Sequence, residues 1–178
     1  LRNAAHVEHD LVGGFGGAGR EQLGDRAPDH ERNLSPGGLE ECEVIGNWVK
    51  KLNPRIDYVL SSDARRTQQT YREIGKRFPL PKAELTPQLY LAPAGKIMNL
   101  INKLPDTANS ALVIGHNPGF FEFAERALPE EERAEAAADG FSTCGLFIME
   151  APVTEWDLLG FGMGRFTYYV TPKTVSSF

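Results

Sequence analysis

The chain has 178 residues, which is enough for one domain with a buried core that needs no disulfide or metal ion to hold it together. Its formal net charge of −5 argues against non-specific binding to nucleic acid, which requires a basic surface. No apolar run approaches the roughly 20 residues of a membrane-spanning helix. A composition of 41% hydrophobic and 24% charged residues is typical of a soluble globular protein.

The two cysteines, Cys42 and Cys144, lie far apart in the sequence and form no CxxC motif. This favours reduced thiols over a disulfide. No signal peptide is visible, although the sequence opens on Leu1-Arg2 without a methionine. We therefore expect a cytoplasmic protein.

Apolar periodicity predicts helices that alternate with short strands along most of the chain. Residues 10–38 are rich in glycine and lack an apolar period, so a long loop is predicted there. Residues 128–141 are charged and alanine-rich, which predicts an exposed helix or a lid. The other predicted elements are a helix from Gly38 to Leu52, a strand at 57–61, helices at 64–77 and 94–104, a strand at 111–115, a helix from 118, and strands at 143–150, 155–160 and 166–171.

This alternation predicts an α/β fold, a three-layer α/β/α sandwich with a mostly parallel central sheet. The sequence contains no internal repeat and no composition shift that would mark a second domain. Residues 1–178 are therefore expected to form a single domain.

The motif Gly115-His116-Asn117-Pro118 directly follows the apolar run Ala111 to Ile114. A buried strand is expected to end there on a histidine, with Pro118 in the first turn of the next helix. The backbone N–H groups and the positive dipole end of that helix favour an anion. This motif therefore predicts an anion site beside an imidazole.

A second strand end, after Tyr58-Val59-Leu60, leads into the segment that contains Arg66. Carboxyl ends of parallel strands meet at one sheet edge, so Arg66 and His116 are expected at the same edge. Either residue alone is more often structural than functional. Together, an arginine fork and a histidine that can hydrogen-bond or transfer protons predict a site that handles phosphate.

These segments resemble the histidine phosphatase superfamily, also called the phosphoglycerate-mutase-like fold, and within it the small bacterial phosphohistidine phosphatases. The resemblance covers residues 32–173 in the family's order. It rests on Ser61-Ser62 through Arg66-Thr67 and Thr70, on Gly115–Pro118, and on the supporting segments Arg32–Ser35, Leu89–Ala92, Thr143–Leu146 and Val170–Lys173.

The resemblance implies a phosphatase that acts on phosphohistidine or a small phosphomonoester through a phosphohistidine intermediate, with no cofactor and no metal. Its partner would be a phosphorylated small molecule or a phosphohistidine protein. Arg2, Arg66 and His116 would hold the phosphoryl oxygens, with the backbone of Asn117 assisting from the helix start.

The family's nucleophile is the histidine of an Arg-His pair at the end of the first strand, and Leu1-Arg2-Asn3-Ala4 is similar to this stretch. Asn3 has no nucleophilic nitrogen, because its lone pair is delocalised into the carbonyl, so covalent catalysis is expected to be absent or severely reduced. A second alignment places His6 at this position instead. In the first alignment almost all of the first strand would precede Leu1. A catalytically silent relative that binds phosphate or a phosphoprotein is the alternative function.

Three further features of the sequence give little indication of function. Glu84 is the one candidate proton donor to the leaving group, although nothing in the sequence supports it. The GxGxxG pattern at 14–19 follows a charged segment rather than a strand, which favours a flexible loop over a nucleotide site. His6, His9 and His30 form no recognisable metal-binding pattern, so no metal site is predicted.

Overall fold

The computed structural model describes residues 9–16, 27–136 and 142–175. These residues form a sheet with the strand order β3-β2-β4-β1-β5-β6. In chain order the elements are β1 (His9–Gly16), η1 (Asp29–Glu31), α1 (Pro36–Leu52), β2 (Tyr58–Ser62), α2 (Arg65–Gly75), β3 (Glu84–Thr86), η2 (Pro87–Leu89), α3 (Ala94–Ile101), β4 (Ser110–Gly115), α4 (Gly119–Ala127), α5 (Glu130–Ala136), β5 (Leu146–Ala151), η3 (Trp156–Leu158), β6 (Arg165–Val170) and α6 (Pro172–Val175), where η marks a 3-10 turn.

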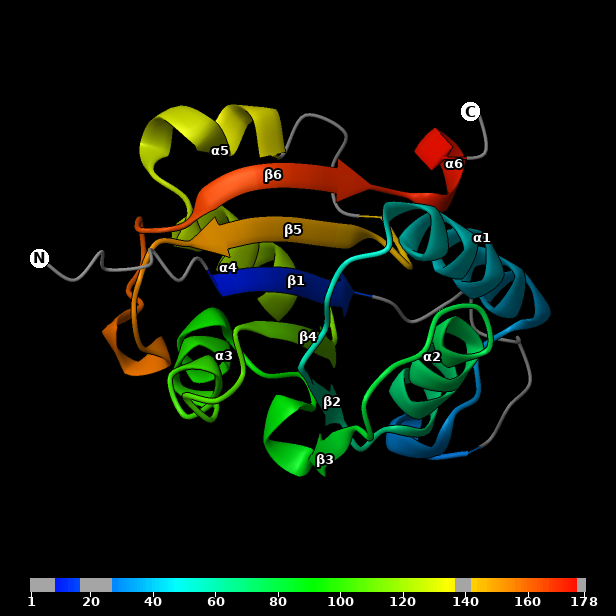
Figure 1. The fold of residues 1–178 in the computed structure, drawn as a ribbon. Helices are drawn as coiled ribbons and strands as arrows, with labels where there is room; N and C mark the ends of the chain where they lie inside the picture. Colours follow the sequence, from blue (N-terminus) through cyan, green and yellow to red (C-terminus); the bar gives the residue numbers. More distant parts are fainter. Residues whose placement is uncertain (1–8, 17–26, 137–141, 176–178) are drawn as a thin grey trace, which may run out of the picture.

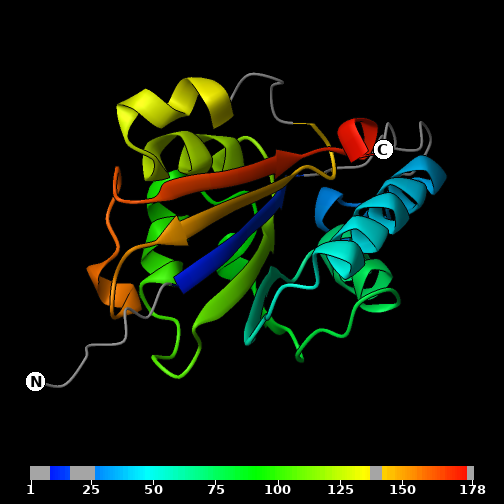
Figure 2. The ribbon, with the colours of Figure 1, turned by 45° about the horizontal axis from the view of Figure 1, so that its top comes forward.

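The sheet is mostly parallel, as predicted. Strands β1, β2, β3 and β4 pair in parallel, and β5 and β6 extend the sheet antiparallel from β1. Helices α1 and α2 cover one face of the sheet, and α3 and α4 cover the other (Figure 1). The turned view shows the same sheet between the two helical layers (Figure 2). The three-layer α/β/α sandwich is therefore confirmed.

Alternate residues of the central strands point into opposite layers, as the pleat of a β-strand requires. Val59 and Leu112 belong to the core formed with α1 and α2. Their neighbours Leu60 and Val113 belong to the core formed with α3 and α4. All six residues of β4 are buried, which explains why its sequence is a continuous apolar run rather than an alternation.

The prediction that residues 10–38 form a loop is wrong for the first seven of them. Strand β1 lies in the middle of the sheet and pairs with β4 on one side and β5 on the other. The register with β4 shifts between Val12 and Phe15, so Gly13 and Gly14 form a bulge, where glycine is common. Backbone pairing on both sides therefore makes a strand of a segment whose glycines suggest a loop.

The same loop prediction also runs too far at its other end. Helix α1 begins at Pro36, because the hydroxyl of Ser35 caps it by accepting a hydrogen bond from the amide of Gly38 at 3.1 Å.

The predicted strand at 155–160 is also wrong: the fully buried indole of Trp156 donates to the carbonyl of Ala108 at 2.8 Å and holds the 3-10 turn η3 there. Strand β3 was not predicted at all.

Residues 128–141 are described only as far as Ala136, and this part contains the short helix α5. The role of this segment as a lid therefore stays a prediction.

Cys42 and Cys144 are buried free thiols whose sulfur atoms lie 3.6 Å apart. In the part of the chain that the structure describes, none of the helices combines the length and the apolarity that a membrane crossing requires.

Candidate active site

His116 is placed at the carboxyl edge of the sheet by the end of strand β4. Its side chain is almost fully buried, and Nε2 lies 2.9 Å from the hydroxyl oxygen of Ser62, the last residue of β2. A Cβ on Gly115 would lie 2.0 Å from the ring of Phe120, so glycine is needed before the histidine for α4 to pack closely. The sequence correctly predicted that this imidazole follows a buried strand and precedes a helix.

Burial is the main reason that His116 stays uncharged well below neutral pH. Together with the nearby positive charge of Arg66, burial lowers the pKa of His116 to about 4. One ring nitrogen then carries a proton, and the other is an acceptor. Nδ1 is buried and has no hydrogen-bond partner among residues 9–16, 27–136 and 142–175.

Arg66 is the second residue of α2, and its side chain is buried beside the end of β2. Its Nη1 donates to the carbonyl oxygen of Asp29 at 2.6 Å, and its Nη2 donates to the Asp29 carboxylate at 3.0 Å. Nε is buried, and no partner for it exists within the described residues. Asp29 therefore holds the two terminal nitrogens of the guanidinium, and Nε stays without a partner in the part of the chain that is described.

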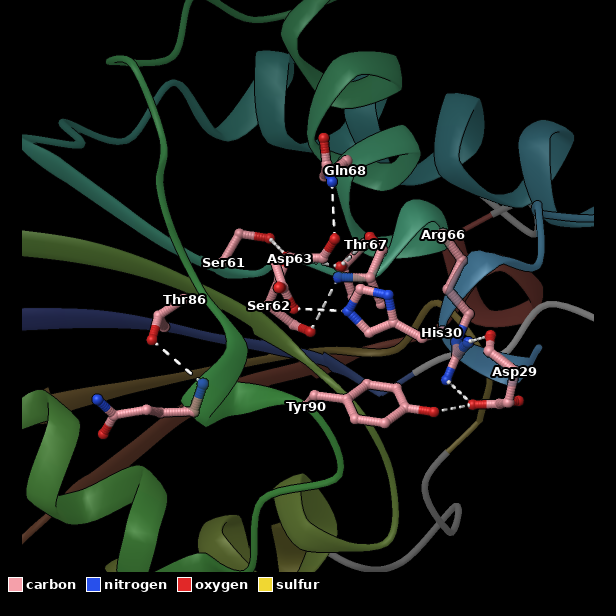
Figure 3. A network of polar contacts seen from close by, with 12 residues as sticks. Asp29, His30, Ser61, Ser62, Asp63, Arg66, Thr67, Gln68, Thr86 and Tyr90 are labelled. Carbon is pink, nitrogen blue, oxygen red and sulfur yellow. Dashed lines mark hydrogen bonds and ion pairs between the residues drawn. The ribbon is translucent and has the colours of Figure 1, made fainter.

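Asp29 and Tyr90 are site residues that the sequence did not identify. The phenol of Tyr90 donates to the Asp29 carboxylate at 2.5 Å, on the same oxygen that binds Arg66, and Figure 3 shows both side chains reaching Asp29. The hydrogen bond from Tyr90, with help from Arg66, holds the pKa of Asp29 below its ordinary value. Leu89–Ala92 carried part of the family resemblance, whereas Asp29 stood in a predicted loop without any signal.

The ring of Tyr90 connects the two predicted phosphate-binding residues. Its centroid lies 5.3 Å from that of His116 in an edge-to-face arrangement, and the guanidinium carbon of Arg66 lies 5.9 Å from it. The sequence placed Arg66 and His116 at one sheet edge, and the structure brings both against the same aromatic ring. Asn117 lies directly before Pro118, the N-cap of α4, and its buried Oδ1 also lacks a described partner.

Three predicted site residues, Arg2, Asn3 and His6, lie outside the described residues, so their roles stay predictions. The expectation that the first strand precedes Leu1 is wrong, because the strand beside β4 is β1 at His9–Gly16. In the parallel register Gly16 pairs with Gly115, so Gly16 stands at the carboxyl end of β1 next to the site. The eight residues of β1 contain one histidine, His9, and it begins the strand at the opposite end.

Glu84, the candidate proton donor, lies on β3 and accepts a hydrogen bond from Tyr58. Burial and Glu84 raise the pKa of Tyr58 to about 12. Both residues line a pocket with Lys103 and Leu104 that does not include Arg66 or His116. The structure therefore does not bring Glu84 to the site. No group of three metal-ligating side chains occurs in the described ranges.

Comparisons with known proteins find relatives in sequence and in fold. No protein-family model matches the chain. An uncharacterized protein of Mycobacterium tuberculosis (strain H37Rv) is 32% identical over 129 residues, which is 70% of this chain and 80% of that protein. The phosphohistidine phosphatase SixA of Escherichia coli K12 is 35% identical over 99 residues, 53% of this chain and 60% of SixA.

The fold gives the same result over almost the full length. The structure of the protein histidine phosphatase SixA complexed with tungstate superimposes with a TM-score of 0.73 at 25% identity, covering 94% of this chain and 99% of that one. These likenesses support a function of the histidine-phosphatase type. The chain belongs to the histidine phosphatase superfamily and has the phosphoglycerate-mutase-like fold of the SixA phosphohistidine phosphatases.

Proposed function

We propose that this chain is a phosphatase that acts on phosphohistidine or a small phosphomonoester, with the phosphoryl group held between Arg66 and His116. The observation that carries the proposal is the pair of buried nitrogen atoms, Arg66 Nε and His116 Nδ1, that lack partners in the described part of the chain. A buried polar group without a hydrogen bond costs about 1–3 kcal/mol. A phosphoryl group supplies acceptor oxygens for both, provided that Ser62 donates to His116 Nε2 and Nδ1 carries the proton.

The surrounding charges suit a phosphoryl group as well. Arg66 is permanently charged, and Asp29 and Tyr90 fix its guanidinium before substrate arrives. Helix α4 begins at Gly119, three residues after His116, and its N-terminus adds a positive partial charge. Such preorganised donors stabilise the negative charge that develops on the phosphoryl oxygens in the transition state.

The acceptor of the phosphoryl group is the part of the proposal that rests on the resemblance. If Asn3 fills the nucleophile's position, turnover through a covalent intermediate is lost or severely slowed, since an amide cannot take up the group. If His6 fills it, the covalent route is retained. Both residues precede β1 in the sequence.

One observation favours the second candidate function, a catalytically silent relative that binds phosphate or a phosphoprotein. The carboxyl end of β1, which pairs with Gly115 beside the site, holds Gly16 rather than a histidine. The Arg66–His116 pair would then bind a phosphoryl group that the chain does not cleave.

Hydrolysis assays separate the two functions. We expect the parent chain to hydrolyse phosphohistidine and p-nitrophenyl phosphate in the presence of a metal chelator, and a marked rise of both rates in Asn3→His would assign the phosphoryl acceptor to position 3. Loss of the parent's activity in His6→Asn, with no gain in Asn3→His, would assign the nucleophile to His6. A parent and an Asn3→His variant that bind inorganic phosphate but hydrolyse neither compound would contradict the phosphatase and establish the silent relative.

A further inference from the structure

A second histidine lies beside the phosphate site in the described structure. His30 follows Asp29 in the turn η1, and its Nε2 lies 2.7 Å from the Asp63 carboxylate. Asp63 in turn follows Ser62, the hydroxyl partner of His116. His30 is thus the chain neighbour of Asp29, which binds Arg66. Asp63 is the chain neighbour of Ser62, which binds His116.

The ring of Tyr90 contacts both imidazoles. Its ring centroid is 4.9 Å from that of His30 and 5.3 Å from that of His116, and both contacts are edge-to-face. The environments of the two histidines differ: the His30 side chain is 39% exposed, whereas His116 is buried. One imidazole thus lies inside the phosphate site, and the other lies at its boundary with solvent.

A polar pocket of about 300 Å³ opens where His30 and Asp63 lie. Helix α2 supplies the rest of its wall with Arg65, Gln68 and Arg72, and η1 contributes Glu31. The phosphoryl group of a substrate would be buried between Arg66 and His116, so the group that carries it must extend outward. Arg66 and His116 are not part of the wall of this pocket, and His30 and Asp63 connect it with them through Tyr90 and Ser62.

Stability alone accounts poorly for the His30–Asp63 pair. Both side chains are about one-third exposed, and ion pairs near the surface typically contribute no more than about 1 kcal/mol. A carboxylate that binds one ring nitrogen does, however, fix the orientation and tautomer of a histidine that transfers protons. The arrangement is that of an oriented acid–base group at the mouth of an anion site.

We propose that His30, oriented by Asp63, is a further catalytic residue that protonates the leaving group of a substrate whose carrier occupies this pocket. The proposal rests on the phosphatase function proposed above. Within that function it favours alkyl phosphomonoesters, whose alkoxide leaving group requires a proton. Asp63 is a positioning residue in this scheme.

The proton and electron balance of the step is simple. The P–O bond breaks, its electron pair goes to the ester oxygen, and the proton of the His30 imidazolium goes to the same oxygen. The phosphoryl group passes to its acceptor and finally to water, and the proton released by that water restores His30. The sum is hydrolysis of the ester to an alcohol and inorganic phosphate.

The test compares two leaving groups in the full chain. Phosphoserine has a poor alkoxide leaving group, whereas p-nitrophenyl phosphate has a good one that needs little protonation. General acid catalysis contributes about 100-fold or more, so His30→Asn should lower kcat/KM for phosphoserine by about that factor and for p-nitrophenyl phosphate by less than about tenfold. Asp63→Asn should show the same selectivity with a smaller loss. The control is His9→Asn, at the opposite end of β1, and it should match the parent on both compounds.

Each other outcome overturns the assignment in a different way. Equal losses on both compounds would make His30 structural, and no loss would remove it from the reaction, while the phosphatase function stands in both cases. Recovery of phosphorylated His30 would make it the phosphoryl acceptor instead of a proton donor. A parent chain that hydrolyses neither compound would overturn the phosphatase function and this role together. If His30→Asn fails to fold, the selectivity of Asp63→Asn decides the question.

Discussion

Replacing Arg66 with methionine is expected to lower kcat/KM for phosphohistidine by about 100-fold or more, the usual effect of removing one charged donor from a preorganised anion site. Methionine retains the apolar bulk of the buried stem but removes the positive charge and Nε, which has no partner among the described residues. The Asp29 side chain is 42% exposed, so its carboxylate remains hydrated after the guanidinium is removed. The loss should therefore appear in phosphate binding and catalysis rather than in folding.

Two variants and a ligand effect make this result specific. Arg66→Lys should recover only part of the loss, because a lysine ammonium cannot donate from Nε and a terminal nitrogen together. Arg165→Met removes an arginine that is 62% exposed on β6, and it should behave like the parent. Inorganic phosphate should raise the thermal midpoint of the parent and of Arg165→Met but not of Arg66→Met. A parent-like phosphate response in Arg66→Met would contradict the role assigned to Arg66.

Replacing His116 with glutamine should also lower kcat/KM by about 100-fold, because the variant lacks the buried ring nitrogen, Nδ1, that the proposed function assigns to a phosphoryl oxygen. The same substitution should change how stability depends on pH. The pKa of His116 is about 4 in the folded chain, whereas an unfolded histidine has a pKa near 6.5. Between these values the unfolded chain binds more protons, so the free energy of unfolding falls as the pH decreases from about 6.5 to about 4.

The size of this effect follows from the difference in pKa. A difference of about 2.5 units corresponds to about 3 kcal/mol of stability lost across that pH range. Urea unfolding of the parent and of His116→Gln at several pH values measures it, because acid effects at carboxylates such as Asp29 are common to both proteins. The difference between the two curves should shrink as the pH falls toward 4. Saturating phosphate should oppose this loss, since a bound anion raises the pKa of His116. Parallel curves would contradict the neutral, buried state of this histidine.

Arg66 and His116 could be predicted from the sequence because local patterns determine their positions. Each follows an apolar strand, and the carboxyl ends of parallel strands meet at one edge of the sheet. The apolar run before Gly115 is too short for a typical helix and therefore predicts a central strand, and the structure has β4 there. For these two residues a one-dimensional pattern was enough.

Asp29, Tyr90 and the His30–Asp63 pair could not be predicted in the same way. Asp29 meets Tyr90 across 61 positions in the chain, and His30 meets Asp63 across 33. Nothing in a glycine-rich segment indicates that its end will return to the sheet edge. Strand β1 was missed for a related reason: its strand conformation depends on pairing with β4 and β5 rather than on its own residues.

The most direct test of the central claim is a crystal structure of the parent chain with inorganic phosphate. The Arg66–His116 site predicts one phosphate with oxygen atoms about 2.7–3.2 Å from both Arg66 Nε and His116 Nδ1. Asp29 and Tyr90 should keep their contacts on the other edge of the guanidinium. A phosphate found only elsewhere, or an Arg66–His116 site that stays empty at saturating phosphate, would contradict it.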